Sequence, residues 1–288
     1  MASGAPVVTR FAPSPTGYLH RGHAFSALTA AKAATDDRGG RFLLRMEDID
    51  RPRCRPEFEP AIFEDLAWLG LSWETPVRRQ SEHMDDYHAA LSRLREDGLV
   101  YRCFKTRAEV MAESASAPHG PTEPFVGASL PKTEEERRLE AGEPFAWRLS
   151  LNAARAKLAG RYDSLSFVEM GAGPRGEHGL IAADPAADGD VIVARKDLGV
   201  AYHLAVVVDD ALQGVNLIVR GADLFDAVPV QRLLQALLGL PAPTYRHHRI
   251  LTGPDGKRYA KRARAETLCA IRGRGVSADE LRTELGFD

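Results

Sequence analysis

The residues best suited to chemistry lie near the N-terminus, where residues 10–23 read RFAPSPTGYLHRGH. His20 and His23 are three positions apart, so a helix would place both on one face. Residues 13–17 would turn the backbone ahead of that helix, and Gly22 would keep side-chain bulk away from the turn. A helix N-terminus presents N–H groups and a positive dipole end to an anion. The segment therefore indicates a nucleotide site, although an isolated HxxH pair is by itself an ordinary feature.

Two further charged segments could complete a site of this kind. Residues 47–51 read EDIDR after an apolar stretch, and a carboxylate such as Glu47 is the partner that an ammonium group requires. Residues 257–264 read KRYAKRAR and supply five basic side chains that could neutralise phosphate charge. Either segment could instead be a solvated loop.

The elements that position these residues follow from the hydrophobic pattern. Residues 7–11 and 41–47 read as short strands, and the Ala-rich stretch 20–37 between them reads as a helix. A strand–helix–strand unit of this length indicates a parallel sheet, whose carboxyl edge is the usual ligand site. The later strands of this sheet are expected at residues 190–196, 215–219 and 245–251.

The rest of the chain divides between helices and a loop-rich region. Further helices are expected at residues 56–68, 84–97, 223–238 and 278–285, with a short one around Cys269. Within residues 99–190 we expect strands at 101–104 and 146–151, a short charged helix around 134–138, and loops at 114–132 and 171–190. We interpret 99–190 as an insertion between two halves of the parallel sheet.

The composition indicates a soluble globular protein, with 288 residues of which 44% are hydrophobic and 27% charged. The net charge of −2 excludes a generally basic nucleic-acid coat, so any RNA contact would use local basic patches. We see no signal-peptide pattern and no apolar run long enough to span a membrane. Three dispersed cysteines, Cys54, Cys103 and Cys269, favour a reducing, cytoplasmic compartment.

Together, the motifs resemble the class I aminoacyl-tRNA synthetases of the glutamyl and glutaminyl branch. RFAPSPTG followed by HxGH matches the first signature of that branch, RMEDIDRPR matches a second block, and residues 258–262 fall in register with the KMSKS motif. The resemblance implies an α/β fold with a Rossmann-like parallel sheet, in a shortened form of the glutamyl enzyme. The implied parts are a first catalytic half at 1–98, an inserted acceptor-binding-type subdomain at 99–190, a second catalytic half at 191–262, and a short helical C-terminus at 263–288, with no anticodon-binding domain.

The resemblance also implies roles for individual residues. His20, Gly22 and His23 would bind ATP, and Lys261 of the KMSKS-like loop would assist the two histidines in catalysis. The residues expected to hold glutamate are Arg10, Ala12, Ser14, Glu47, Tyr202 and Arg220. The guanidinium of Arg220 would pair with a carboxylate side chain and not with a neutral amide. On residue type alone, Tyr202 could instead be a core aromatic.

The chain departs from the family pattern at the zinc site of bacterial relatives. Cys103 stands at the first ligand position, but Lys105, Phe125 and Ser129 occupy the others, so no zinc is expected. The KMSKS-like loop keeps its second lysine and departs from the motif at three other positions.

The implied function is a two-step reaction. ATP and L-glutamate would form glutamyl-adenylate, with Mg²⁺ bound mainly through the phosphates. The glutamyl group would then pass to the queuosine base in the anticodon loop of tRNA(Asp). The protein would supply positioning and charge stabilisation, because the substrate carboxylate is itself the nucleophile. We expect a monomer without membrane contact.

Three alternatives remain open. The first is a shortened glutamyl-tRNA synthetase that charges tRNA(Glu), against which the length and Val206, in place of the usual asparagine, both argue. The second is a non-catalytic RNA- or nucleotide-binding paralogue, which would lack pyrophosphate exchange. The third is a ligase that adenylates a carboxylate and transfers it to a small molecule without tRNA.

Overall fold

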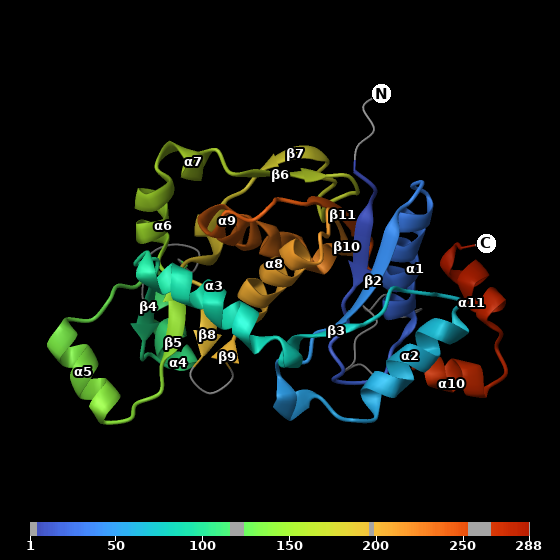
Figure 1. Ribbon diagram of the computed structural model, residues 1–288, viewed down its shortest axis with the longest axis horizontal. Helices are drawn as coiled ribbons and strands as arrows, with labels where there is room; N and C mark the ends of the chain where they lie inside the picture. Colours follow the sequence, from blue (N-terminus) through green and yellow to red (C-terminus); the bar gives the residue numbers. More distant parts are fainter. Residues whose placement is uncertain (1–4, 116–123, 196–198, 253–265, 288) are drawn as a thin grey trace.

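A computed structural model describes residues 5–115, 124–195, 199–252 and 266–287 of the chain as an elongated α/β body (Figure 1). Its first sheet comprises β1 (Val8–Phe11), β2 (Arg41–Met46) and β3 (Arg78–Arg79). Neighbouring strands of this sheet run parallel, and helix α1 (Arg21–Thr35) crosses from β1 to β2. These elements confirm the strand–helix–strand unit predicted near the N-terminus.

A second sheet lies beside the first. In spatial order its strands are β10 (Leu217–Gly221), β11 (Thr244–His248), β6 (Ser166–Glu169) and β7 (Gly179–Ala182). The first three are parallel, and β7 is an antiparallel edge strand. The N–H of Asn216 donates to the carbonyl of Val8 at 3.1 Å, which joins the start of β10 to β1. The strands predicted at 215–219 and 245–251 are confirmed, the second of them ending at His248.

Residues 190–196 do not continue this parallel arrangement, so that prediction is wrong. They supply β8 to a third sheet, whose strands are β4 (Val100–Cys103), β5 (Ala146–Leu149), β8 (Ile192–Arg195) and β9 (Gly199–Val200). All neighbours in this sheet are antiparallel. The apolar run of β8 is buried as expected, with Val193 at 0% exposure, but burial does not determine which sheet a strand joins.

The expectation of a loop over residues 171–190 is also wrong in part. Strand β7 and the 3₁₀ helix η3 (Pro185–Asp188) both fall within it. Residues of β7 alternate between half-buried and exposed, so this edge strand has only a weak hydrophobic signature. The second and third sheets each combine strands from residues 99–190 with strands from residues 191–262. The sheets therefore do not follow the boundaries expected from the sequence, and the division into 1–98, 99–190, 191–262 and 263–288 stays a prediction.

Helices pack around these sheets. The remaining ones are η1 (Arg51–Arg53), α2 (Phe58–Trp68), η2 (Gln80–Glu82), α3 (Met84–Glu96), α4 (Arg107–Ala115), α5 (Lys132–Glu140), α6 (Leu151–Leu158), α7 (Gly160–Asp163), α8 (Tyr202–Leu212), η4 (Ala222–Ala227), α9 (Val228–Leu238), α10 (Leu268–Gly273) and α11 (Ala278–Leu285). The helices predicted at 56–68, 84–97 and 278–285 are confirmed, whereas the one at 223–238 divides into η4 and α9. No helix in the described part of the chain is long and apolar enough to cross a membrane.

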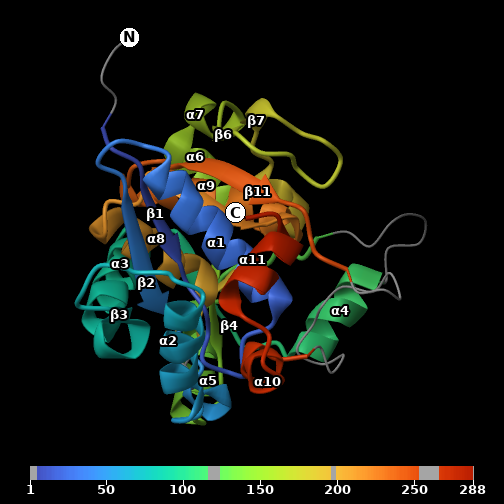
Figure 2. The ribbon, with the colours of Figure 1, turned by 90° about the vertical axis from the view of Figure 1, so that its right-hand side faces the viewer.

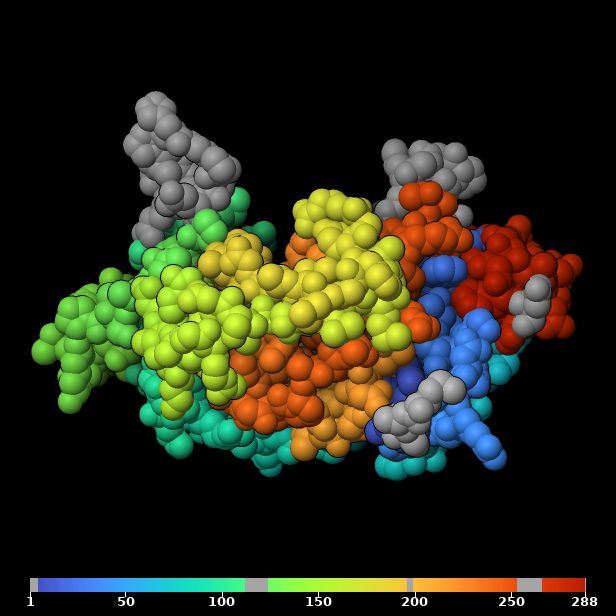
Figure 3. All heavy atoms as spheres, turned by 90° about the horizontal axis from the view of Figure 1, so that it is seen from above, coloured from blue at the N-terminus to red at the C-terminus, as the bar shows by residue number. Residues whose placement is uncertain are grey.

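Two apolar clusters hold the frame around the site. Helices α3, α8 and α9 pack with the third sheet in one cluster, and α1, α2, α10 and α11 pack with the first sheet in the other. Figure 2 shows the C-terminal helices beside α1 and α2, and Figure 3 shows them at the end opposite α5. Arg21 of α1 also pairs with Glu284 of α11 at 2.8 Å. Helix α1, whose first turn carries predicted site residues, is therefore anchored to the C-terminal helices.

Candidate active site

The carboxyl ends of β1, β2, β10 and β11 meet the N-termini of α1 and α8 around one cavity of about 530 Å³. Its walls include the following residues singled out from the sequence: Arg10, Ala12, Ser14, His20, Gly22, His23, Glu47, Tyr202 and Arg220. Parallel strands end at the same edge of a sheet, which is why segments far apart in sequence converge there. Lys261 and the rest of the KMSKS-like segment lie outside the described residues. The structure thus brings together every predicted site residue that it describes.

The two histidines form a closed unit at the start of α1. His20 is the N-cap, and its Nδ1 accepts the N–H of Gly22 at 3.1 Å. The N–H of His20 in turn donates to Nδ1 of His23 at 3.2 Å, and the two ring centres are 3.8 Å apart. Because each Nδ1 is an acceptor, the proton of each neutral imidazole is assigned to Nε2. Each ring therefore carries an Nε2–H donor of the kind that binds a phosphate oxygen.

The proline turn before α1 is tied to the segment that follows β2. The N–H of Glu47 donates to the carbonyl of Pro13 at 3.0 Å, and the N–H of Arg55 donates to that of Pro15 at 3.3 Å. These bonds fix the turn, including Ser14, beside Glu47 at the carboxyl edge of the first sheet. Pro13 and Pro15 restrict the backbone further, because the ring of each proline fixes its φ angle.

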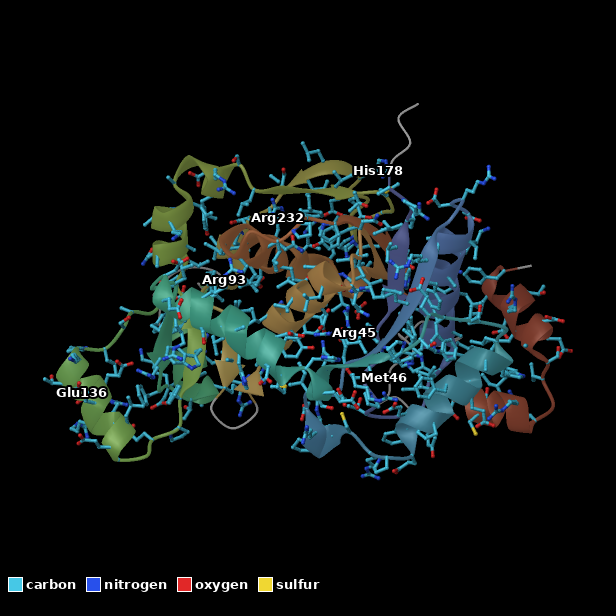
Figure 4. The ribbon with its side chains drawn as sticks, viewed as in Figure 1. Arg45, Met46, Arg93, Glu136, His178 and Arg232 are labelled. Atoms are coloured by element: carbon cyan, nitrogen blue, oxygen red, sulfur yellow. The ribbon has the colours of Figure 1, made fainter. Side chains whose placement is uncertain are left out.

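A buried ionic network supports the floor of the cavity. Arg45 projects from β2 toward α8 (Figure 4), where it donates to Asp210 at 2.8 Å and to Gln213 at 3.0 Å. It also donates to Glu47, the residue after β2, at 3.1 Å. Arg10 donates to the same Asp210 through Nε at 3.0 Å. Burial raises the pKa of Glu47, although Arg45 and Arg10 oppose this effect. The network places Arg10 and Glu47, both cavity residues, at fixed positions.

Asp209 extends the network away from the cavity. Its carboxylate accepts hydrogen bonds from Arg78 at 2.6 Å, Gln80 at 2.7 Å and Tyr87 at 2.8 Å. These supporting residues, Arg45, Asp209 and Asp210, are not among the site residues predicted from the sequence. A usable signal was present: charges interrupt or end apolar runs in RFLLRM and LAVVVDD, and buried charges need partners.

Arg220 is the cavity-lining end of a second buried group of side chains. Its Nε donates to Nε2 of His247 at 3.1 Å, its Nη1 donates to Gln231 at 3.0 Å, and the guanidinium lies 5.4 Å from the ring centre of Tyr245. Its Nη2 is buried and has no hydrogen-bond partner among the described residues. All three contacts are with uncharged groups, and Arg220 forms no ion pair within the described part of the chain. A buried cation in a cavity wall with an unused donor suits an anionic ligand.

Tyr202 supplies a hydroxyl to the same cavity. It is the first residue of α8, whose N-terminus opens there. Burial raises the pKa of Tyr202, with Arg220 acting in the opposite direction. The hydroxyl therefore remains protonated at neutral pH and can donate a hydrogen bond.

The cavity has further lining residues that are not among those predicted from the sequence. They include Phe25, Ser26, Asp223, Leu224 and residues 248–251. The ring of Phe25 contacts that of His248 at 5.1 Å between centres, and the guanidinium of Arg249 lies 5.1 Å from the Phe25 ring centre. This mixed apolar and polar wall can accept a heterocyclic base. Single aromatic and aliphatic residues of this kind carry no sequence signal distinct from core packing.

The predicted loss of a zinc site stays a prediction. Lys105 places its ammonium group 5.4 Å from the ring centre of Phe125, so these two positions pack against each other. Within the described ranges, no three His, Cys, Asp or Glu side chains are grouped so that they could hold a metal ion.

Comparisons with known proteins cover nearly the whole chain. Residues 6–277 match the family described as tRNA synthetases class I (E and Q), catalytic domain. A protein from Rhodobacter capsulatus named glutamyl-Q tRNA(Asp) synthetase is 43% identical over 98% of this chain and 100% of its own length. A protein of the same name from Symbiobacterium thermophilum is 42% identical over 96% of this chain and 85% of its own.

A solved structure agrees with the fold. The glutamate tRNA ligase from Elizabethkingia meningosepticum, crystallised with its amino acid, superposes with a TM-score of 0.75 at 24% identity. The match covers 96% of this chain, which spans 64% of the length of that ligase. Relatives 42–43% identical to this chain carry the name glutamyl-Q tRNA(Asp) synthetase, and the chain itself belongs to the class I tRNA synthetases of the E and Q family, which are ligases.

Proposed function

We propose that the chain activates L-glutamate with ATP to form glutamyl-adenylate and transfers the glutamyl group to the queuosine base at the anticodon wobble position of tRNA(Asp). One observation carries the proposal: Arg220, with its unused buried Nη2, lines the same cavity as the paired histidines of α1. A carboxylate site and a phosphate site in one cavity are what the activation of an acidic amino acid requires. The name shared by the relatives supplies the acceptor.

Glutamate binding uses charges of both signs. The side-chain carboxylate of the substrate pairs with Arg220, and the hydroxyl of Tyr202 donates to it. The ammonium group pairs with Glu47, which Arg45 and the backbone bond to Pro13 hold in place. Arg10, Ala12 and Ser14 form the adjoining wall, so that the α-carboxylate is directed toward the α1 N-terminus.

ATP is the other substrate, as in the family as a whole. His20 and His23 donate from Nε2 to phosphate oxygens, supported by the positive end of the α1 dipole, and Gly22 leaves room for the nucleotide. Lys261 neutralises the charge that develops as pyrophosphate leaves. Mg²⁺ accompanies the triphosphate and is held mainly by phosphate oxygens. The glutamate carboxylate attacks the α-phosphorus, and pyrophosphate is the leaving group.

The anticodon loop is proposed to bind across residues 99–190, the inserted part. There the guanidinium of Arg102 lies 4.6 Å from the ring centre of Trp147, and Lys105 lies against Phe125. Arg95 of the neighbouring helix α3 places its guanidinium 4.9 Å from the same Trp147 ring centre. Cations interleaved with aromatic rings suit a single-stranded RNA loop, whose bases stack and whose phosphates need local positive charge. We propose that the chain acts as a cytoplasmic monomer without zinc.

The deciding experiment is transfer of labelled glutamate, with ATP and Mg²⁺, onto total tRNA from queuosine-containing and queuosine-lacking cells. Label that appears only on queuosine-containing tRNA supports the proposal. Label on both preparations, carried by tRNA(Glu), identifies a shortened charging enzyme instead. Pyrophosphate exchange without any labelled tRNA points to a small-molecule acceptor. Absence of exchange with ATP and glutamate overturns the enzymatic proposal.

A further inference from the structure

Three side chains on neighbouring strands form a continuous hydrogen-bonded chain that ends at the cavity. Arg220 of β10 and His247 of β11 are register partners in the parallel ladder, and β6, which carries Glu169, is the next strand. Nε of Arg220 donates to Nε2 of His247 at 3.1 Å, and Nδ1 of His247 lies 2.5 Å from Oε2 of Glu169. Glu169 and His247 are 0% and 2% exposed. Neither residue lines the cavity, so both reach it only through Arg220.

The chain of bonds determines which nitrogen of His247 carries the proton. A carboxylate is acceptor-only, so Nδ1 must donate to Glu169, and Nε2 must then accept from Arg220. Burial, together with the charge of Arg220, lowers the pKa of His247 to about 4, which keeps the ring neutral at physiological pH. The imidazole therefore has its proton on Nδ1, the opposite of the assignment for His20 and His23.

The carboxylate of Glu169 is itself fixed by the backbone. Its Oε1 accepts the N–H of Gly171 at 2.7 Å and the N–H of His247 at 2.9 Å, which leaves only Oε2 for the imidazole. Gly171 lies so close that an added Cβ would be 2.3 Å from the carbonyl oxygen of His247 and 2.9 Å from Oε1 of Glu169. This site therefore requires a glycine, and the carboxylate has one possible orientation.

The arrangement orients Arg220 without neutralising it. A carboxylate bound directly to the guanidinium would occupy the donors that a substrate carboxylate needs. With a neutral imidazole in between, Glu169 stabilises the cation from behind, and Nη2 keeps no partner among the described residues. Gln231 holds Nη1 at 3.0 Å, so the guanidinium plane is fixed at two points.

We propose that Glu169 and His247 are positioning residues for substrate recognition, which hold the guanidinium of Arg220 with its free edge toward the side-chain carboxylate of glutamate. This inference rests on the proposed function, because it takes glutamate as the anion that Arg220 binds. The two residues are expected to affect the KM for glutamate and not the KM for ATP, because the ATP phosphates bind at the start of α1.

The sharpest test is Glu169→Gln, which preserves size and changes one group. The amide oxygen must take the place of Oε1 to accept the two backbone N–H groups, so the amide NH₂ faces Nδ1 of His247. Nδ1 then becomes an acceptor, the proton moves to Nε2, and that N–H points at the Nε–H of Arg220. We expect the KM for glutamate in pyrophosphate exchange to rise at least tenfold, with the KM for ATP unchanged within twofold.

Two further variants keep the test falsifiable if Glu169→Gln does not fold. His247→Phe removes the acceptor and should raise the glutamate KM similarly, whereas His247→Gln restores an acceptor oxygen near the Nε2 position and should recover part of the loss. Arg246→Gln is the matched control, because Arg246 precedes His247 on β11 and lines a different cavity. It should leave both KM values unchanged.

Nitrogen NMR of ¹⁵N-histidine-labelled protein gives a readout that does not depend on catalysis. The Nδ1–H form of His247 should be present in the native chain and replaced by the Nε2–H form in Glu169→Gln. A changed protonated nitrogen with an unchanged glutamate KM, or an equal rise in both KM values, would overturn the positioning role. A native chain that neither binds glutamate nor exchanges pyrophosphate would overturn the proposed function instead.

Discussion

Arg45 and Asp210 form an ion pair at 2.8 Å between side chains that are 0% and 4% exposed. Asp210 also accepts from Arg10 at 3.0 Å, so one carboxylate faces two buried guanidinium groups. Burial alone would raise the pKa of Asp210, but Arg10 and Arg45 lower it below its usual value. The same ionic network that stabilises the fold also positions the cavity, because Arg10 lines the cavity and Arg45 holds Glu47.

Asp210→Asn is therefore expected to destabilise the fold strongly. Removing one partner of a buried ionic network leaves uncompensated charge, which costs about 3–5 kcal/mol. Urea unfolding of both proteins measures the loss. The matched control is Asp36→Asn, which removes an exposed pair with Lys32 and should cost less than about 1 kcal/mol. If both substitutions cost the same, the buried network does not stabilise the fold.

The role of Asp210 also has a pH signature. Its pKa is lower in the folded chain than its ordinary value, so its stabilising effect is present above that ordinary value and is lost as pH falls toward the folded one. The difference in unfolding free energy between the native chain and Asp210→Asn should accordingly shrink on acidification below about pH 4. A difference that stays constant from pH 7 to pH 3 would contradict the ionic account.

His20 has a structural role and a proposed chemical one, which two substitutions separate. His20→Asn keeps a side-chain acceptor at the N-cap of α1, whereas His20→Ala removes it and should cost about 1 kcal/mol of stability. Both remove the Nε2–H donor, so pyrophosphate exchange should fall roughly 10²–10³-fold in each. Thermal unfolding and exchange assays on the pair decide the matter. A native rate of pyrophosphate exchange in His20→Asn would show that His20 acts only as the N-cap of α1.

Arg220→Leu tests the carboxylate site directly. Loss of this charge-assisted contact should raise the KM for glutamate about a hundredfold, because about 2.7 kcal/mol corresponds to that factor. The KM for ATP should hardly change. Arg232→Leu is the control, since Arg232 is a nearby partly buried arginine that donates to the carbonyl of Ser166 and lies outside the cavity. Comparable effects of both arginine substitutions would indicate general disruption.

The sequence predicts the cavity residues better than the connections between them. His20, Glu47 and Arg220 each follow or end a strand in a parallel unit, and such ends converge at one sheet edge. Strand β8 shows the limit, because an apolar run predicts burial and not its antiparallel partner. Glu169 and His247 show another limit: their relation to Arg220 depends on strand order, which pairs Glu169 of β6 with Tyr245 of β11, 76 positions later in the chain. The local pattern determines which face of a strand is buried, but it does not determine which distant strand becomes its neighbour.

Asp65 of α2 is a buried carboxyl away from the cavity, and its ionisation is expected to affect the stability of the fold. It is fully buried, and neither carboxylate oxygen has a hydrogen-bond partner among the described residues. Arg272 of α10 lies 3.9 Å from Oδ1 but pairs at 3.0 Å with Glu64. Burial raises the pKa of Asp65 to about 6, opposed by Arg272. The folded chain therefore holds this proton at pH values where the unfolded chain has released it.

A raised pKa of an acid gives a stability that is present at low pH and declines as pH rises from about 4 to about 6. Asp65→Asn removes the cost of ionising the buried carboxyl. The stability of the variant relative to the native chain should therefore increase as the pH rises from about 4 to about 6. At pH 7.5 we expect an advantage of about 3 kcal/mol, or about 6–12 °C in melting temperature, and little at pH 4. Asp163→Asn is the control, because it changes an exposed carboxylate that pairs with Arg155 at 3.6 Å, and it should show no such trend. Thermal unfolding at both pH values measures the difference, and an Asp65→Asn advantage that is equal at pH 4 and pH 7.5 would show that ionisation of Asp65 is not its source.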